Sequence, residues 1–376
     1  MKHELRMLYS TQEQSNHGKR NTALDMARGL AIILIVIGHC SYVGGVPAVW
    51  LSTFHLPAFF LLSGWLSAEK TPGKEKIKTL LFRKASSVLV PYLWFSAGSL
   101  VLDLIQVFRG SFTWDMLWGH LMETISLQGY SVMWFLPVFF LTQIMIDLTG
   151  QGLNKANVKG GMVHVVSAIG FSALAILFYV LYHGVISKIL PAFLVAEIRI
   201  VIKAVIGAAF CSYGELAAVT VKGIVKKGKK AGAGLLVAGL VLMAVNVIAS
   251  FRCGHMDLNN LNVGFLPYYF ILGTTGSIGM ILVCMKLPNI PLLTFYGQNS
   301  LIIMCTHMNF YVMYLAIRII DIIAAPFTDF WHPLWIVCML VITMLLEIPV
   351  ILLIRVCFPF VLGRARVHRA VSLKEK

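Results

Sequence analysis

The sequence predicts an all-α polytopic membrane protein with about ten transmembrane helices. Hydrophobic residues make up 58% of the 376 residues and charged residues only 12%, whereas charged residues are about a quarter of an ordinary soluble domain. The mean hydropathy is +0.81. The apolar residues form long continuous runs and not the short alternating segments of barrel strands. Helices are therefore the expected spanning form.

Ten apolar runs are long enough to cross a hydrocarbon layer of about 30 Å. The first run follows a polar leader and has no small-residue cleavage site after it, so we expect a retained span and not a signal peptide. We predict a cytoplasmic leader over 1–23, a transmembrane domain over 24–357 and a basic cytoplasmic tail over 358–376. The runs lie near 24–43, 49–68, 86–108, 131–148, 162–183, 195–220, 231–250, 265–285, 292–318 and 333–357.

Lysine and arginine are distributed unevenly between alternate connections. Twenty-three of the 31 fall in the two tails and the even-numbered connections, whereas the opposite connections hold three: Arg109, Lys188 and Arg252. Positive residues collect on the cytoplasmic side of membrane proteins. We therefore expect both termini in the cytoplasm and the chain in the cytoplasmic membrane. The same distribution explains the net charge of +15, and we expect the bilayer and not nucleic acid as its partner.

Arg28 and His39 are ionisable residues within the first apolar run. A separation of eleven residues is close to three helical turns, so both side chains project from one face about 16 Å apart. Ionisable groups at membrane depth are costly and point to function. Asp25 lies one turn before Arg28, within pairing distance. The alternative is an arginine that only marks the inner boundary of the membrane.

Two further histidines are expected at the depth of His39. His55 enters the second run from outside, and His307 lies in the outer half of the ninth. A neutral imidazole accepts a proton from a hydroxyl or carries an acyl group, so His39 and His55 are the catalytic candidates and His307 supports them. A hydrogen bond between helices explains any one of them equally well. Glu347, in the last run, is a supporting candidate that would orient a histidine, pair with a cation or carry protons in a transporter.

The two longest outward connections, 109–130 and 251–264, mix aromatic and polar residues in a way that suits a carbohydrate. An aromatic belt at the membrane interface explains them equally well. The seven cysteines show no metal-ligand spacing, so we expect no metal site and no permanently bound cofactor. The polar and aromatic residues of these connections are Trp114, Trp118, His120, Glu123, His255, Asp257, Asn259 and Asn260.

Five segments, spread over nearly the whole chain, carry a family resemblance. They are LDMARGLAI at 24–32 running to Gly38 and His39, FHLPAFFLLSGW at 54–65, VPY at 90–92, MWFLP at 133–137, and FYGQNSL at 295–301 leading to His307. The chain resembles the acyltransferase-3 family of integral membrane O-acyltransferases, and the arginine and histidine of the first run are the most specific element. Trp134 and the segment 257–260 are similar to the polysaccharide and fucose O-acetyltransferase branch.

The resemblance implies ten core helices and transfer of an acyl group, usually acetyl from acetyl-CoA. The acceptor would be a hydroxyl of a cell-surface or exported carbohydrate or of a lipid-linked glycan. Arg28, Arg83 and Lys84 would then bind acyl-CoA, with Trp134 in support, and Asn259 and Asn260 would bind the acceptor.

One departure concerns the second basic pair, which members of the family commonly separate by two residues. Here Arg83 and Lys84 are adjacent, and Ser87 stands three positions after Lys84. The whole segment 70–84 is also explained as a basic loop on the cytoplasmic side.

Two other classes of protein remain open. A transporter or flippase of a glycan precursor also uses proline-broken helices, a buried glutamate and histidines at membrane depth. Against it, the sequence shows no inverted repeat. A sensor or regulatory subunit without catalysis is the third class, and the retained Arg28 and His39 argue against it through the resemblance alone.

Overall fold

The computed structural model describes residues 21–40, 45–68, 76–158, 160–226, 229–324 and 332–363. Within these ranges the chain is helical apart from turns and an isolated β-bridge between Asp257 and Asn262, which confirms the predicted fold class. Seven of the described helical segments are long and apolar enough to cross a membrane, so the chain is a multi-pass membrane protein. The count of ten spans and the side of each terminus stay predictions. Most of the predicted leader and tail, and residues 69–75 of the basic loop, lie outside the described residues.

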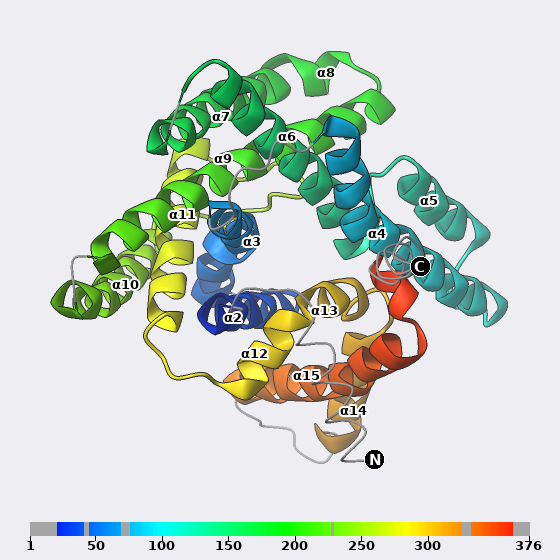
Figure 1. Ribbon diagram of the computed structural model, residues 1–376. Coiled ribbons are helices and arrows are strands. Elements are labelled where there is room, and N and C mark those ends of the chain that lie inside the picture. Colours follow the sequence, from blue (N-terminus) through cyan, green and yellow to red (C-terminus); the bar gives the residue numbers. More distant parts are fainter. Residues whose placement is uncertain are drawn as a thin grey trace, which may run out of the picture.

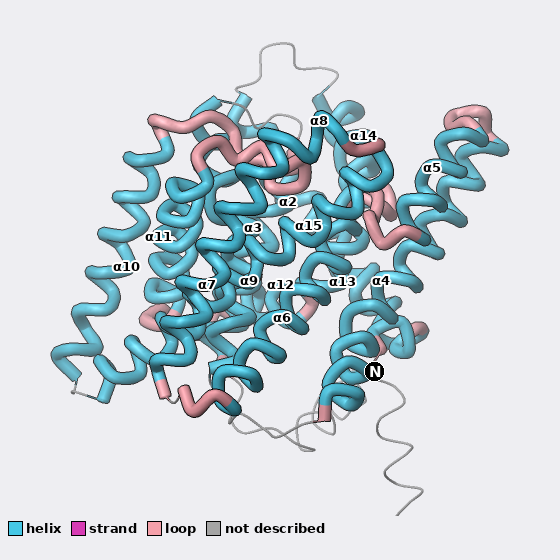
Figure 2. Tube along the Cα trace, turned by 90° about the horizontal axis from the view of Figure 1, so that it is seen from above, coloured by secondary structure: helices cyan, strands magenta, loops and turns pink. Residues whose placement is uncertain are grey.

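Figure 1 shows the helices arranged around the short central α2. In Figure 2 most of them run lengthwise between two ends of the molecule that carry the connections. The elements are α2 (Thr22–Gly38), α3 (Gly45–Ala68), α4 (Ile77–Phe108), α5 (Trp114–Ile125), η1 (Ser131–Trp134), α6 (Phe135–Lys155), α7 (Gly161–Leu181), η2 (Tyr182–Ile186), α8 (Ser187–Ile189), α9 (Ala192–Lys226), α10 (Lys229–Ser250), α11 (Leu266–Cys284), α12 (Pro291–Gln298), α13 (Ser300–Thr306), α14 (Val312–Ala324), α15 (His332–Cys357) and η3 (Pro359–Leu362).

The ninth predicted span, 292–318, is not one helix, and in this respect the prediction was wrong. It is divided into α12, α13 and α14. Asn299 separates the first two: its side-chain Nδ2 donates to the Phe295 carbonyl at 2.7 Å, and such local bonds compete with the helical backbone. Tyr311, with φ +59, turns the chain between α13 and α14. The chain therefore enters the middle of the molecule as two short helices and a turn, which carry His307.

Helices α3 and α9 cross at two glycines. A Cβ atom on Gly64 would lie 1.9 Å from the Cys211 carbonyl oxygen, and one on Gly214 would lie 2.0 Å from that of Leu61. Small residues allow helices in membranes to approach this closely. Helix α9 also packs against α6 and α7 and forms, with α3, the main contact of the bundle.

Helices α2 and α12 are held together in the same way. A Cβ atom on Gly29 would lie 2.0 Å from the Leu293 carbonyl oxygen, and one on Gly297 would lie 1.7 Å from that of Asp25. The contact brings Gln298 next to α2, where its Nε2 donates to Asp25 Oδ2 at 3.4 Å. The first turns of α2 are thus fixed against α12.

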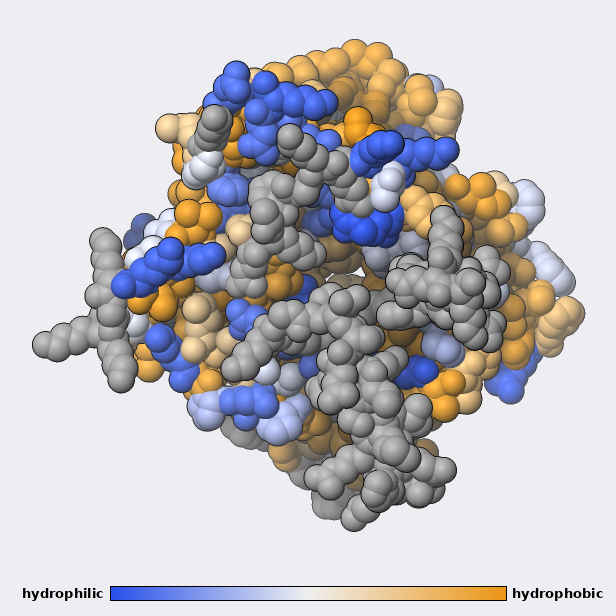
Figure 3. All heavy atoms as spheres, viewed as in Figure 1, coloured by the Kyte–Doolittle hydropathy of each residue, from blue (hydrophilic) through white to orange (hydrophobic). Residues whose placement is uncertain are grey.

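The surface fits a bilayer. Large apolar side chains are exposed along α4, α7, α10 and α15, among them Val101, Leu177, Leu240 and Leu345. Figure 3 shows hydrophilic residues gathered on the face of Figure 1 and hydrophobic ones around its rim, with the face hollowed near its middle.

Candidate active site

The candidate site extends along α2, and Arg28 near the start of this helix marks its first end. The Asn21 side chain caps the helix by accepting from the backbone N–H of Leu24. The predicted ion pair is present, with Arg28 Nη1 3.6 Å from Asp25 Oδ1. The Asp25 side chain is 4% exposed and that of Arg28 is 30% exposed. The buried carboxylate therefore holds the guanidinium at a fixed height while part of it faces outward.

The second end is His39, the residue that caps α2 at its C-terminus. Because α2 is unbroken between the two residues, its rise places Arg28 and His39 about 16 Å apart. The ring of His39 lies 5.3 Å from that of His307, centroid to centroid. His39 is exposed, whereas His307 is fully buried. The broken ninth segment thus brings a second imidazole against the first.

The hydrogen bonds of His307 fix its tautomer. Its Nδ1 lies 2.7 Å from the Ile303 carbonyl oxygen, and a carbonyl can only accept, so Nδ1 carries the proton. Nε2 is then a proton acceptor, and within the described residues it has no hydrogen-bond partner. A buried imidazole with a free lone pair is suited to contact a reacting group.

His55 is the second catalytic candidate. It is half-buried on α3, and its Nδ1 donates to the Leu51 carbonyl, so its Nε2 is also an acceptor. The ring contact is between His39 and His307, and His55 lies on α3, which packs against α2.

Glu347 is fully buried, but it does not orient a histidine. Its two carboxylate oxygens lie 3.0 and 2.8 Å from the Thr306 hydroxyl, one residue before His307. Among its contacts within the described residues there is no cation. Glu347 therefore joins α15 to α13 at the residue that precedes His307.

Arg83 and Lys84, the second basic pair, have different surroundings. Arg83 is exposed. The Nζ of Lys84 lies 2.9 Å from both Asp147 Oδ2 and Gln143 Oε1, on α6, and Gln143 in turn donates to Ser63 Oγ on α3 at 2.7 Å. Lys84 thus has its charge matched within the protein, and this network joins α4, α6 and α3.

Replacing Lys84 with methionine is expected to lower stability more than donor binding. The Asp147 side chain is 22% exposed and would lose its cation, which we expect to cost about 1–3 kcal/mol, less than for a fully buried pair. K84M/D147L should recover most of the loss, because no unpaired charge remains. Thermal unfolding in detergent measures both variants. A double variant as unstable as K84M, with a raised KM for acetyl-CoA in both, would instead place Lys84 in the donor site.

The predicted acceptor residues have partners of their own. Asn259 Oδ1 accepts from Lys203 Nζ at 2.9 Å, and this ammonium lies 4.4 Å from the centre of the Trp134 ring. Asn260 Nδ2 donates to Asp257 Oδ2 at 2.6 Å within the same loop. Asn259 and Trp134 are thus connected through Lys203, which sequence reasoning missed. The signal was a lysine inside an apolar run, four residues after Arg199.

Comparison with known proteins identifies the family of the chain. The Nodulation protein NolL of Mesorhizobium japonicum is 28% identical over 137 residues, which are 34% of this chain and 35% of that protein, so the similarity spans about a third of the relative's length. No solved structure matches the chain. The sequence model of the acyltransferase-3 family, described as an acyltransferase domain, matches residues 21–353, and this match includes Arg28, His39 and His307. The chain therefore belongs to the acyltransferase-3 family.

Proposed function

We propose that the protein is a membrane O-acyltransferase that moves an acetyl group from acetyl-CoA to a hydroxyl of a cell-surface or exported carbohydrate. One observation carries the proposal: a partly exposed guanidinium and a pair of imidazoles stand at opposite ends of the same unbroken helix. Membership of the acyltransferase-3 family supports the reaction class.

The donor would enter from the side of Arg28. Its guanidinium makes charge-assisted hydrogen bonds to phosphate oxygens, and the exposed Arg83 adds positive charge on the same side under the predicted topology. The thioester then has about 16 Å of helix to pass before it reaches His39, and an extended pantetheine arm covers such a distance.

His39 would be the residue that acts on the reacting groups. In direct transfer its imidazole takes the proton of the acceptor hydroxyl, whose oxygen attacks the thioester carbonyl. The C–S bond breaks, and the thiolate receives that proton, so the products are the acetyl ester and CoA. In the alternative, His39 attacks first and the hydroxyl then removes the acetyl group from its ring. His307 would contact the His39 ring in either case, and His55 on α3 is the second candidate to assist.

The proposal is tested with purified protein in lipid nanodiscs. Thiol release from acetyl-CoA, in the presence and absence of a mixture of surface glycans, reports thioester loss directly. We expect release that depends on glycan, and glycans heavier by acetyl units in mass spectra. Glycan transport without thioester loss would overturn the proposal in favour of a carrier. Intact-protein mass spectra after acetyl-CoA alone separate the two routes, because only the second leaves an acetylated His39.

A further inference from the structure

A pocket of about 270 Å³ lies away from α2, where the end of α4, the connection 109–130 and the turn at 307–311 meet. Sequence reasoning noted the connection as suited to carbohydrate but assigned no residue of it to the site. The side chains that matter for its chemistry are Asp103, His120, Glu123, Tyr130, Asn309 and Tyr311. The turn that supplies Asn309 begins at His307, and Met308 of the same turn also lines the pocket.

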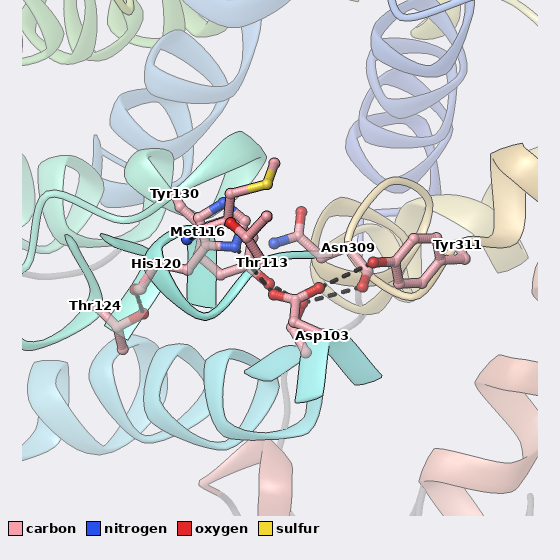
Figure 4. Close-up of polar contacts among 9 residues, drawn as sticks. Asp103, Thr113, Met116, His120, Thr124, Tyr130, Asn309 and Tyr311 are labelled. Carbon is pink, nitrogen blue, oxygen red and sulfur yellow. Dashed lines mark hydrogen bonds and ion pairs between the residues drawn. The ribbon is translucent and has the colours of Figure 1, made fainter. Parts of the chain in front are cut away.

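Asp103 organises one wall of the pocket. Its side chain is buried, and both oxygens are used: Oδ2 accepts from His120 Nδ1 at 3.0 Å, and Oδ1 accepts from the Tyr311 hydroxyl at 2.9 Å (Figure 4). The His120 ring stacks flat on Tyr130, with centroids 3.9 Å apart and 9° between the planes. Nδ1 of His120 donates to Asp103, so in the neutral ring Nε2 is an acceptor held in a fixed direction.

Asn309 supplies an amide whose hydrogen-bonding capacity is largely unused. The residue is 5% exposed, and within the described residues the Tyr130 hydroxyl is the polar neighbour of its amide, without well-aligned hydrogen-bond geometry at Oδ1 or Nδ2. Figure 4 shows the amide directed toward His120 and Tyr130. The Tyr130 hydroxyl is nearby but bonds to Ser99, whose hydroxyl donates to the Asn309 backbone carbonyl. Burying an amide whose hydrogen bonds are incompletely satisfied is costly, so a ligand that both accepts from it and donates to it is favoured.

The charge and volume of the pocket limit the kinds of ligand that it can bind. Two carboxylates, Asp103 and Glu123, line the pocket, and none of its described lining residues is a lysine or arginine. The pocket therefore disfavours phosphates and other anions, which excludes the CoA end of the donor. Its volume is just below the roughly 300–1,000 Å³ of sites for drug-sized ligands. It has room for one sugar-sized group, and the Tyr130, His120 and Tyr311 rings supply apolar faces of the kind that pyranoses stack on.

We propose that this pocket binds one uncharged sugar ring of the acceptor, with the Asn309 amide and His120 Nε2 as its hydroxyl partners. Calling this sugar the acceptor rests on the proposed function, whereas binding of the sugar requires no acyl transfer. It moves acceptor recognition from the loop 257–260 to the connection 109–130 and the turn at 307–311.

The test is saturation-transfer NMR on the purified full chain in nanodiscs, without acetyl-CoA. The probes are methyl glycosides of glucose, galactose, N-acetylglucosamine and fucose, with methyl glucuronide as the anionic comparison. We expect at least one neutral glycoside to bind and the glucuronide to bind more weakly. Asn309→Ala should weaken the neutral probe by roughly tenfold, the effect of losing one or two hydrogen bonds. The variant should fold, because it keeps the backbone carbonyl that accepts from Ser99 and removes no well-aligned side-chain hydrogen bond.

Asn154→Ala is the matched control. Asn154 is exposed near the C-terminal end of α6 and lines no part of the pocket. The affinity of this variant for the neutral glycoside should therefore equal that of the parent protein. Equal binding by the Asn309 variant, or no binding of any glycoside, would overturn the sugar site. Binding intact without thiol release from acetyl-CoA would instead overturn the acyltransferase proposal and leave the pocket standing.

Discussion

Replacing His39 with glutamine is expected to lower kcat for acetyl transfer by about 10²- to 10⁴-fold, the usual contribution of a general acid–base group. Glutamine keeps a polar side chain but cannot take the proton of a hydroxyl or carry an acetyl group. Since His39 caps α2 through its backbone N–H and its side chain is exposed, the variant should fold normally. Thiol release at saturating acetyl-CoA measures the effect, and the KM for acetyl-CoA should change little.

His164→Gln is the matched control for this result. His164 lies on α7, and its Nδ1 is 2.9 Å from Glu215 Oε2, a contact that the glutamine amide can reproduce. Its turnover should equal that of the parent. Full activity in the His39 variant, with a normal control, would remove His39 from the chemistry and leave the histidine group a structural one.

The second large effect is expected at Gly297. Alanine there would place Cβ 1.7 Å from the Asp25 carbonyl oxygen, where only separation of α12 from α2 can relieve the clash. Overpacking of this kind costs about 1–3 kcal/mol or more. Because Asp25 holds Arg28, the same displacement should raise the KM for acetyl-CoA. Thermal unfolding and the KM are measured on one preparation.

Gly150→Ala provides the comparison within a helix. A Cβ atom on Gly150 meets nothing within 4 Å, so the substitution should leave the protein as stable or more stable by about 0.5–1 kcal/mol. If the Gly297 variant unfolds at the same temperature as the Gly150 variant, the close contact between α2 and α12 is not what fixes Arg28.

Much of this arrangement could be predicted from local patterns. Apolar run lengths gave the helical membrane fold, and the regular rise of one helix related Asp25, Arg28 and His39 correctly. The depth of His307 along its own run was enough to place it near His39. These predictions need only the geometry of single helices, which sequence spacing determines.

The parts that escaped prediction depend on partners far along the chain or on local breaks. Lys84 is paired with Asp147, 63 positions later, and no spacing rule relates two such residues. The break at Asn299 arises from one side-chain hydrogen bond inside an apolar run, so hydropathy alone predicts a continuous span. The Asp103 and His120 pair forms only because α5 folds back on α4.

The shortness of α2 has a consequence for the proposed transfer. Its 17 residues extend about 25 Å, less than the roughly 30 Å of a hydrocarbon layer. It is surrounded by other helices, namely α3, α11, α12, α13 and α15. Because α2 contacts protein and not lipid, its short length causes no mismatch with the bilayer. Under the proposed function, the length of this central helix sets the shortest donor arm that could link a phosphate contact at Arg28 to a reacting group at His39.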